Sequence, residues 1–155
     1  ANDVVFEYLK TGEYQPRPSV ETIANAMDVG APSNFARILD LYGHSHQAIS
    51  AKIKGYRYSD NEIRETVYRV YQETGYLCDP HGACGFRALT DDLGTGQVGV
   101  FLETAHPAKF METMNEIVGD GNVILPDKLA AFMKGERKSI PMVNHYPEFK
   151  KFLLM

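Results

Sequence analysis

The segment VGVFLETAHPAKF, residues 98–110, places two side chains that could do chemistry close together. A short apolar run ends at Thr104, and the pair His106-Pro107 begins a new segment. A threonine hydroxyl can hydrogen-bond a ligand, and an imidazole can orient that ligand or carry protons. The alternative is that Thr104 and His106 only cap a helix that begins at Pro107. The local pattern leaves both interpretations open.

The elements around this segment predict how these side chains are positioned. Residues 76–78 and 98–103 are short apolar runs typical of strands, and each is followed by a proline typical of a helix start. Strand, helix, strand and helix in this order predict a βαβ unit with two parallel strands. Since ligands bind beyond the carboxyl ends of parallel strands, we expect residues 78–81 and 103–106 to form one ligand-binding rim.

Helical patterns fill most of the remaining chain, so the predicted fold class is a helix-rich α/β fragment with a small parallel sheet. Two parallel strands are too few for an independent sheet, which suggests a part of a larger protein. The chain also begins at Ala1 without methionine, which is expected of a fragment whose N-terminal part is missing. The alternative is ordinary removal of an initiator methionine before Ala1. Helices are predicted at residues 3–11, 33–42, 60–74, 80–92, 107–118 and 147–154, with shorter ones around Ile49–Ile53 and Leu129–Met133.

Composition argues against several classes of protein. The net charge is −4, from 16 basic and 20 acidic residues without a basic run, so no nucleic-acid partner is expected. No apolar run approaches the roughly 18 residues of a membrane span. Cys78 and Cys84 are expected to be reduced thiols of a cytoplasmic protein. Together with His81 they lack a fourth ligand at matching spacing, so no metal is expected.

Three longer motifs, in this order along the chain, resemble those of threonine synthases. They are TIANAMDVGAPSNFAR at residues 22–37, GYLCDPHGA at residues 75–83 and TAHPAKF at residues 104–110. The pair Asn2-Asp3 also fits the family pattern. The resemblance extends from residue 2 to about residue 133 and is to the bacterial and fungal type of the family.

The resemblance implies a pyridoxal-phosphate (PLP) enzyme of fold type II, the tryptophan-synthase-β-like fold. This family converts O-phospho-L-homoserine and water into L-threonine and phosphate. It carries the cofactor lysine and the cofactor's phosphate loop in its N-terminal half, and no lysine of this chain resembles that lysine. Residues 1–155 are therefore expected to be a single C-terminal portion that is inactive alone. Its expected partners are the substrate and the N-terminal part, and an unpaired strand edge could also form a homodimer.

The same resemblance implies roles for individual residues. Thr104 matches the hydroxyl that hydrogen-bonds the pyridine nitrogen of the cofactor, with His106 as a support behind it. Asn34 and Arg37 match positions that either contact the substrate or anchor a domain interface. Gly82 departs from the family pattern, which more often has threonine or alanine there. The alternatives are another fold type II PLP enzyme, related to threonine dehydratase or cysteine synthase, or a stand-alone module without catalysis.

Overall fold

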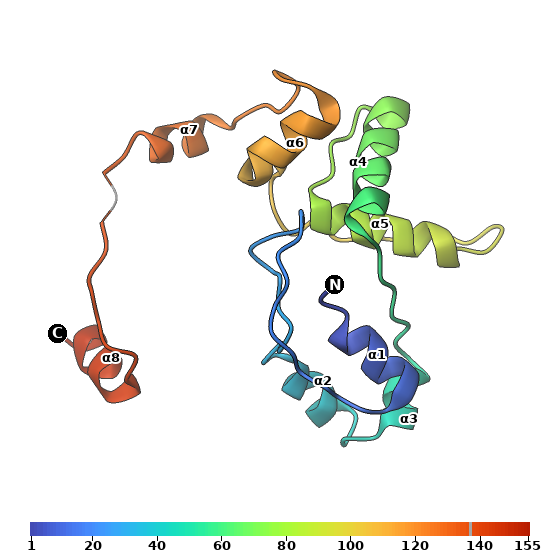
Figure 1. Ribbon diagram of the computed structural model, residues 1–155, viewed down its shortest axis with the longest axis horizontal. Coiled ribbons are helices and arrows are strands. Elements are labelled where there is room, and N and C mark those ends of the chain that lie inside the picture. The colour runs from blue at the N-terminus through green and yellow to red at the C-terminus, as the bar shows by residue number, and fades with distance from the viewer. Residues whose placement is uncertain (137) are drawn as a thin grey trace. The chain divides into compact units, whose positions relative to one another are not determined.

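The computed structural model describes residues 1–136 and 138–155, and these form two units, residues 1–124 and 125–155 (Figure 1). Within these residues no helix has both the length and the apolar character that crossing a membrane requires. The first unit contains α1 (Val4–Thr11), α2 (Phe35–Leu41), α3 (His46–Ser50), α4 (Asp60–Thr74), α5 (Pro80–Asp92), the 3-10 helix η1 (Pro107–Phe110) and α6 (Met111–Val118). The second contains α7 (Asp127–Met133) and α8 (Tyr146–Leu153).

A small aromatic core joins α1, α2 and α3, which lie beside one another in Figure 1. Tyr8, Phe35 and Ile49 are its buried members, one from each helix. The rings of Tyr8 and Phe35 meet edge to face with centroids 4.8 Å apart, and Tyr14 stacks on Phe35 at 4.5 Å. The helix predicted from Ser33 begins two residues later, because residues 33 and 34 form a turn.

A second group of helices is built on α4, which packs against α5 and α6. Its buried apolar face carries Ile63, Val67 and Val70. The predicted start of α4 is confirmed, because the Ser59 hydroxyl accepts from the Glu62 backbone N–H while the Glu62 carboxylate accepts from the Ser59 backbone. This capping box satisfies N–H groups that the first turn of a helix leaves without partners.

The predicted parallel sheet is wrong for the described residues, which contain helices and no strands. Residues 76–78 and 98–103 are irregular, so the βαβ unit of the α/β prediction does not form. Strands require a neighbour that pairs with their backbone N–H and C=O groups. Residues 98–103 instead run along α5, where the ring of Phe101 meets that of Phe86 edge to face at 5.5 Å.

One face of residues 98–102 is apolar and exposed. Val98, Val100 and Leu102 are 95%, 82% and 77% exposed, whereas the intervening Gly99 and Phe101 are partly buried. The alternation is that of a strand whose second face has no cover among the described residues. Such edges template pairing with another chain.

We therefore expect the chain by itself to self-associate at micromolar concentrations through this face. Replacing Val100 by lysine places a charge on the edge and should shift the chain toward monomer in light scattering. Leu41→Lys is the matched control, because Leu41 is 79% exposed on α2 and away from this segment. A monodisperse monomer for the unchanged chain would contradict the prediction.

Candidate functional site

Thr104 and His106 lie in the turn between residues 98–103 and η1, and both are exposed. The His106 ring caps η1, because its Nδ1 accepts a hydrogen bond of 3.1 Å from the Ala108 backbone N–H. The capping interpretation is therefore confirmed for His106. The Thr104 hydroxyl makes no hydrogen bond to any residue that the structure describes, so it is available to a ligand.

A cavity of about 360 Å³ lies beside this turn. His106 and Pro107 form one side, and Tyr71, Tyr76 and Asn122 contribute to the others. The Tyr71 hydroxyl donates to Asn122 Oδ1 at 3.3 Å, which joins the last turn of α4 to the segment after α6. The cavity could accept a small molecule, and its lining includes no lysine.

The two segments predicted to share one rim do meet, at the fully buried side chain of Asp79. Asp79 caps α5, as its position before Pro80 predicts: its Oδ1 accepts from the His81 backbone N–H at 2.8 Å and lies 2.9 Å from His81 Nδ1. The Asp79 backbone N–H donates to Glu103 Oε2 over a long 3.4 Å. Glu103 directly precedes Thr104, so this contact ties the candidate ligand residue to the start of α5.

The pKa values of the two carboxyl groups are shifted in opposite directions. Burial and then the neighbouring Asp79 raise the pKa of Glu103 to about 7. Burial alone would also raise the pKa of Asp79, but hydrogen bonds from Glu103 and from the backbone and ring of His81 hold it below its ordinary value. One carboxyl is therefore ionised and the other protonated over a range of pH below neutrality.

The position of the Glu103 side chain explains why residue 82 is a glycine. A Cβ atom on Gly82 would overlap the Glu103 carboxyl group. The threonine or alanine that the resemblance leads one to expect at this position does not fit beside a glutamate in this orientation. Sequence reasoning placed residue 103 at the predicted rim but assigned no role to Glu103.

The two thiols near this junction are free, Cys78 being buried and Cys84 partly buried, and the described residues contain no group of side chains suited to a metal ion. Cys78 lies before the start of α5 and Cys84 in its second turn. Burial, followed by the nearby carboxylates, raises the pKa of Cys78 to about 12 and that of Cys84 to about 11. Both side chains are therefore neutral thiols at physiological pH, which makes them poor nucleophiles.

Asn34 and Arg37, the other predicted site residues, lie at the start of α2 and are exposed. The Arg37 backbone N–H donates to the Asn34 carbonyl at 3.0 Å, which is an ordinary contact of a first turn. Figure 1 shows α2 beside α1 and α3, whereas α5 lies beside α4. Among the described contacts, none joins these two residues to Thr104 or His106.

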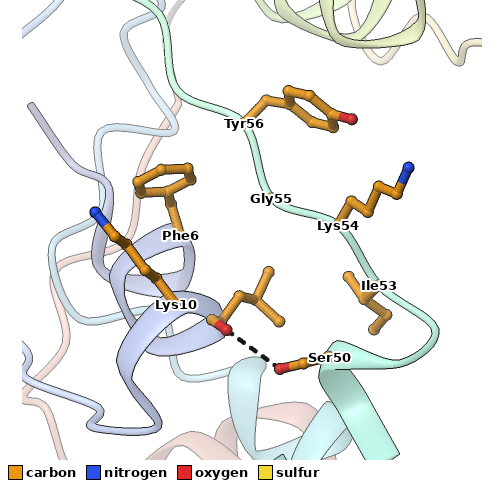
Figure 2. A pocket seen from close by; sticks show the side chains of 8 residues that line it. Phe6, Lys10, Ser50, Ile53, Lys54, Gly55 and Tyr56 are labelled. Atoms are coloured by element: carbon orange, nitrogen blue, oxygen red, sulfur yellow. Dashed lines mark hydrogen bonds between the residues drawn. The ribbon is translucent and has the colours of Figure 1, made fainter. Parts of the chain in front are cut away.

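A second cavity, of about 320 Å³, lies between α1 and residues 50–56 (Figure 2). The Ser50 hydroxyl donates to the Leu9 carbonyl at 3.2 Å along one wall. Lys10 and Lys54 stand at its rim, but Figure 2 shows that their ammonium groups point away from each other. Lys54 is instead paired with Asp92. These two lysines therefore do not converge on an anion.

Comparison with known proteins shows which families and relatives the chain is similar to. The family model described as pyridoxal-phosphate dependent enzyme matches residues 1–102, and the model described as threonine synthase, C-terminal, matches residues 82–153. The chain is 38% identical to the threonine synthase of Haemophilus influenzae over 154 residues, covering 99% of the chain and 36% of that protein. It is 38% identical to that of Escherichia coli over 144 residues, covering 93% of the chain and 32% of that protein.

Solved structures agree with these matches. The crystal structure of threonine synthase from Escherichia coli matches with a TM-score of 0.79 at 34% identity, over 99% of this chain and 35% of that one. A PLP-bound threonine synthase from Brucella melitensis shares the fold with a TM-score of 0.69 at 24% identity, over 98% of this chain and 38% of that one.

The chain belongs to the pyridoxal-phosphate-dependent enzyme family. Within that family it is related to the threonine synthases, and it spans 36% of the length of the Haemophilus influenzae relative. The resemblance found in the sequence motifs is thus confirmed. In fold, the described helices match part of a fold type II PLP enzyme.

The raised thiol pKa values predict slow alkylation of the folded chain. At pH 8, a thiol with a pKa of about 11 carries roughly a hundredfold less thiolate than one with the ordinary value of 9.0. Labelling of Cys84 by iodoacetamide should therefore be slow at pH 8 and accelerate about tenfold per pH unit up to about pH 11. The chain unfolded in guanidinium serves as the control and should react as an ordinary cysteine does. Rapid labelling of the folded chain at pH 8 would contradict the prediction.

Proposed function

We propose that this chain is the C-terminal portion of a threonine synthase and forms one wall of its cofactor site. The reaction is the conversion of O-phospho-L-homoserine and water into L-threonine and phosphate. The observation that supports this most directly is the exposed Thr104 hydroxyl at the end of an extended segment, available to a ligand. The family to which the chain belongs supplies the cofactor, PLP.

Thr104 fits one edge of that cofactor. Its hydroxyl would donate a hydrogen bond to the unprotonated pyridine nitrogen. Bound PLP supplies a sink for the electrons of the bond that breaks. A carboxylate at this position would keep the ring nitrogen protonated, whereas a neutral hydroxyl does not, so Thr104 moderates how far negative charge spreads into the ring. His106 supports the turn that carries Thr104, since its ring caps η1 by accepting a hydrogen bond from the Ala108 backbone N–H.

The exposure of the described lysines is evidence that the catalytic lysine lies elsewhere in the enzyme. A lysine that forms a Schiff base is typically desolvated or placed beside another cation, which lowers its pKa. Each lysine that the structure describes is exposed. Lys109, the nearest in sequence to Thr104, lies over the Phe110 ring with its Nζ 5.7 Å from the centroid. We infer that the reactive lysine and the phosphate loop belong to an N-terminal part that pairs with this chain.

The remaining assignments follow from the same proposal. Asn34 and Arg37 contact either the substrate or the N-terminal part, and their exposure on α2 is compatible with both. Free thiols at Cys78 and Cys84 are compatible with the cytoplasmic location that the sequence predicts.

Phosphate release from O-phosphohomoserine by the full-length protein tests the proposal. Thr104→Val should lower kcat/KM by roughly tenfold or more, because one hydrogen bond to the cofactor is lost. Thr104→Ser keeps the hydroxyl and should retain most of the activity. Thr95→Val, at an exposed turn residue, is the control for a generic loss of a threonine. If the unchanged protein releases no phosphate, the function is wrong, and a dehydratase-like or cysteine-synthase-like relative becomes the better assignment.

The chain alone should release no phosphate and should not bind PLP through a lysine. A spectral titration with PLP checks this, with a second sample whose lysines have been methylated. At micromolar PLP the two titrations should coincide, because none of the described lysines is desolvated in the way that activates a cofactor lysine. A new absorbance band in the unmodified chain that methylation abolishes would contradict the prediction and place a cofactor lysine within residues 1–155.

A further inference from the structure

The contact between Asp79 and Glu103 contains buried acceptors that lack donors. Asp79 Oδ1 is satisfied by His81, but Asp79 Oδ2 and Glu103 Oε1 are buried without a hydrogen-bond partner in the part of the chain that the structure describes. An ionised carboxylate can only accept hydrogen bonds, and a protonated one can also donate. A proton on one of these adjoining groups supplies the missing donor.

The groups around the pair determine which carboxyl takes that proton. The Tyr76 hydroxyl and the Cys78 thiol lie near Glu103, and the His81 ring lies against Asp79 on the other side. Burial raises the pKa of both Tyr76 and Cys78, so these remain neutral near pH 7. Further along α5, the Cys84 thiol lies near Asp79 and near Asp60 of α4, and from η1 the uncharged ring of Phe110 lies 5.3 Å from that of His81.

Asp79 is the member that stays ionised. Its carboxylate accepts from the backbone and ring of His81, and hydrogen bonds to the charged form favour that form. Glu103 accepts a long hydrogen bond from the Asp79 backbone, and it faces a charge of the same sign. Two neighbouring carboxylates in a buried position do not both ionise readily.

We propose that Glu103 and Asp79 share one proton, and that this shared proton fixes the position of Thr104. Glu103 is then a positioning residue, which acts on the cofactor only through its neighbour in the chain. The importance of Thr104 rests on the proposed function, whereas the shared proton does not.

The proposal gives the chain a pH dependence whose sign is determined. The folded pKa of Glu103, about 7, lies above its ordinary value of 4.5, so the folded chain binds more protons than the unfolded chain between these values. The free energy of unfolding therefore falls as pH rises through this window. The lowered pKa of Asp79 acts at lower pH, where stability present above its ordinary value of 3.8 is lost as the pH falls.

Ionisation of the partly buried Glu103 adds a second negative charge beside the buried Asp79. Repulsion moves the Glu103 carboxyl away from α5, and the next residue moves with it. Thr104 is therefore held in place below about pH 7 and released above it.

Carbon-13 NMR of the glutamate side-chain carboxyls tests the proposal on the full chain of 155 residues between pH 4 and 9. The Glu103 signal is assigned by its absence from Glu103→Gln. It should titrate near pH 7, and the Thr104 backbone amide should shift with the same midpoint. In Asp79→Asn the amide still caps α5 but carries no charge, so the Glu103 midpoint should move down toward 4.5.

Two glycines of α5 provide a matched pair of variants. Gly82→Ala places a methyl group where the Glu103 carboxyl lies, and should also move the Glu103 midpoint toward its ordinary value. Gly85→Ala is the control, because its Cβ would meet only the Cβ of Phe101 at an ordinary 3.9 Å. If Gly82→Ala does not fold, Glu103→Gln still tests the proposal: a neutral side chain that can donate should remove the pH dependence of the Thr104 amide.

Each outcome decides the proposal. A Glu103 midpoint near 4.5 in the unchanged chain overturns the shared proton, and a midpoint near 7 that the Thr104 amide does not follow overturns the positioning role. In the full-length protein, kcat/KM should fall above about pH 7, and in Glu103→Gln this limb should be absent. A titration near pH 7 that Thr104 follows, in a protein that releases no phosphate at any pH, supports the shared proton and refutes the proposed function.

Discussion

Backbone N–H and C=O groups need partners, and this requirement governs the part of the chain that surrounds Thr104. Helices satisfy it internally, whereas residues 98–103 have no neighbouring strand among the described residues. Side chains hold this segment in place instead. The Phe101 ring meets Phe86, the side chain of Leu89 lies close over Gly99, and Glu103 contacts Asp79. The position of Thr104 thus depends on one face of an extended segment and on its contacts with α5.

Local signals made several helices predictable. The capping box of Ser59 and Glu62, with Gly75 after the last turn, determines α4 within the residues that form it. Asp79 before Pro80 does the same for the start of α5. The strands could not be predicted in the same way, because pairing depends on a partner outside the segment. Residues 98–103 alternate as a strand does, but the predicted strand does not form, because the described residues contain no strand for it to pair with.

The residues of the candidate site also differ in whether the sequence alone could identify them. Thr104 and His106 could be identified because they lie two residues apart at the end of an apolar run. The contact of Glu103 with Asp79 and Gly82 joins residues more than 20 positions apart, and no short motif contains it. Asn34 and Arg37 came from the first turn of a predicted helix and from a family motif, and the described contacts leave them on α2. Sequence thus identified residues at the ends of elements, and the structure was needed to find what connects those ends.

Asp79 connects the start of α5 to the end of residues 98–103, because its one buried carboxylate both caps the helix and neighbours Glu103. As the cap of α5 it accepts hydrogen bonds from His81, which favours its charged form. As the neighbour of Glu103 it faces a group that would be charged in water, and a buried site does not readily accommodate both charges. The start of the helix and the end of the extended segment therefore cannot be stabilised by two ionised carboxylates at once. A neutral Glu103 resolves the conflict, and it places the protonation state that matters one residue from Thr104.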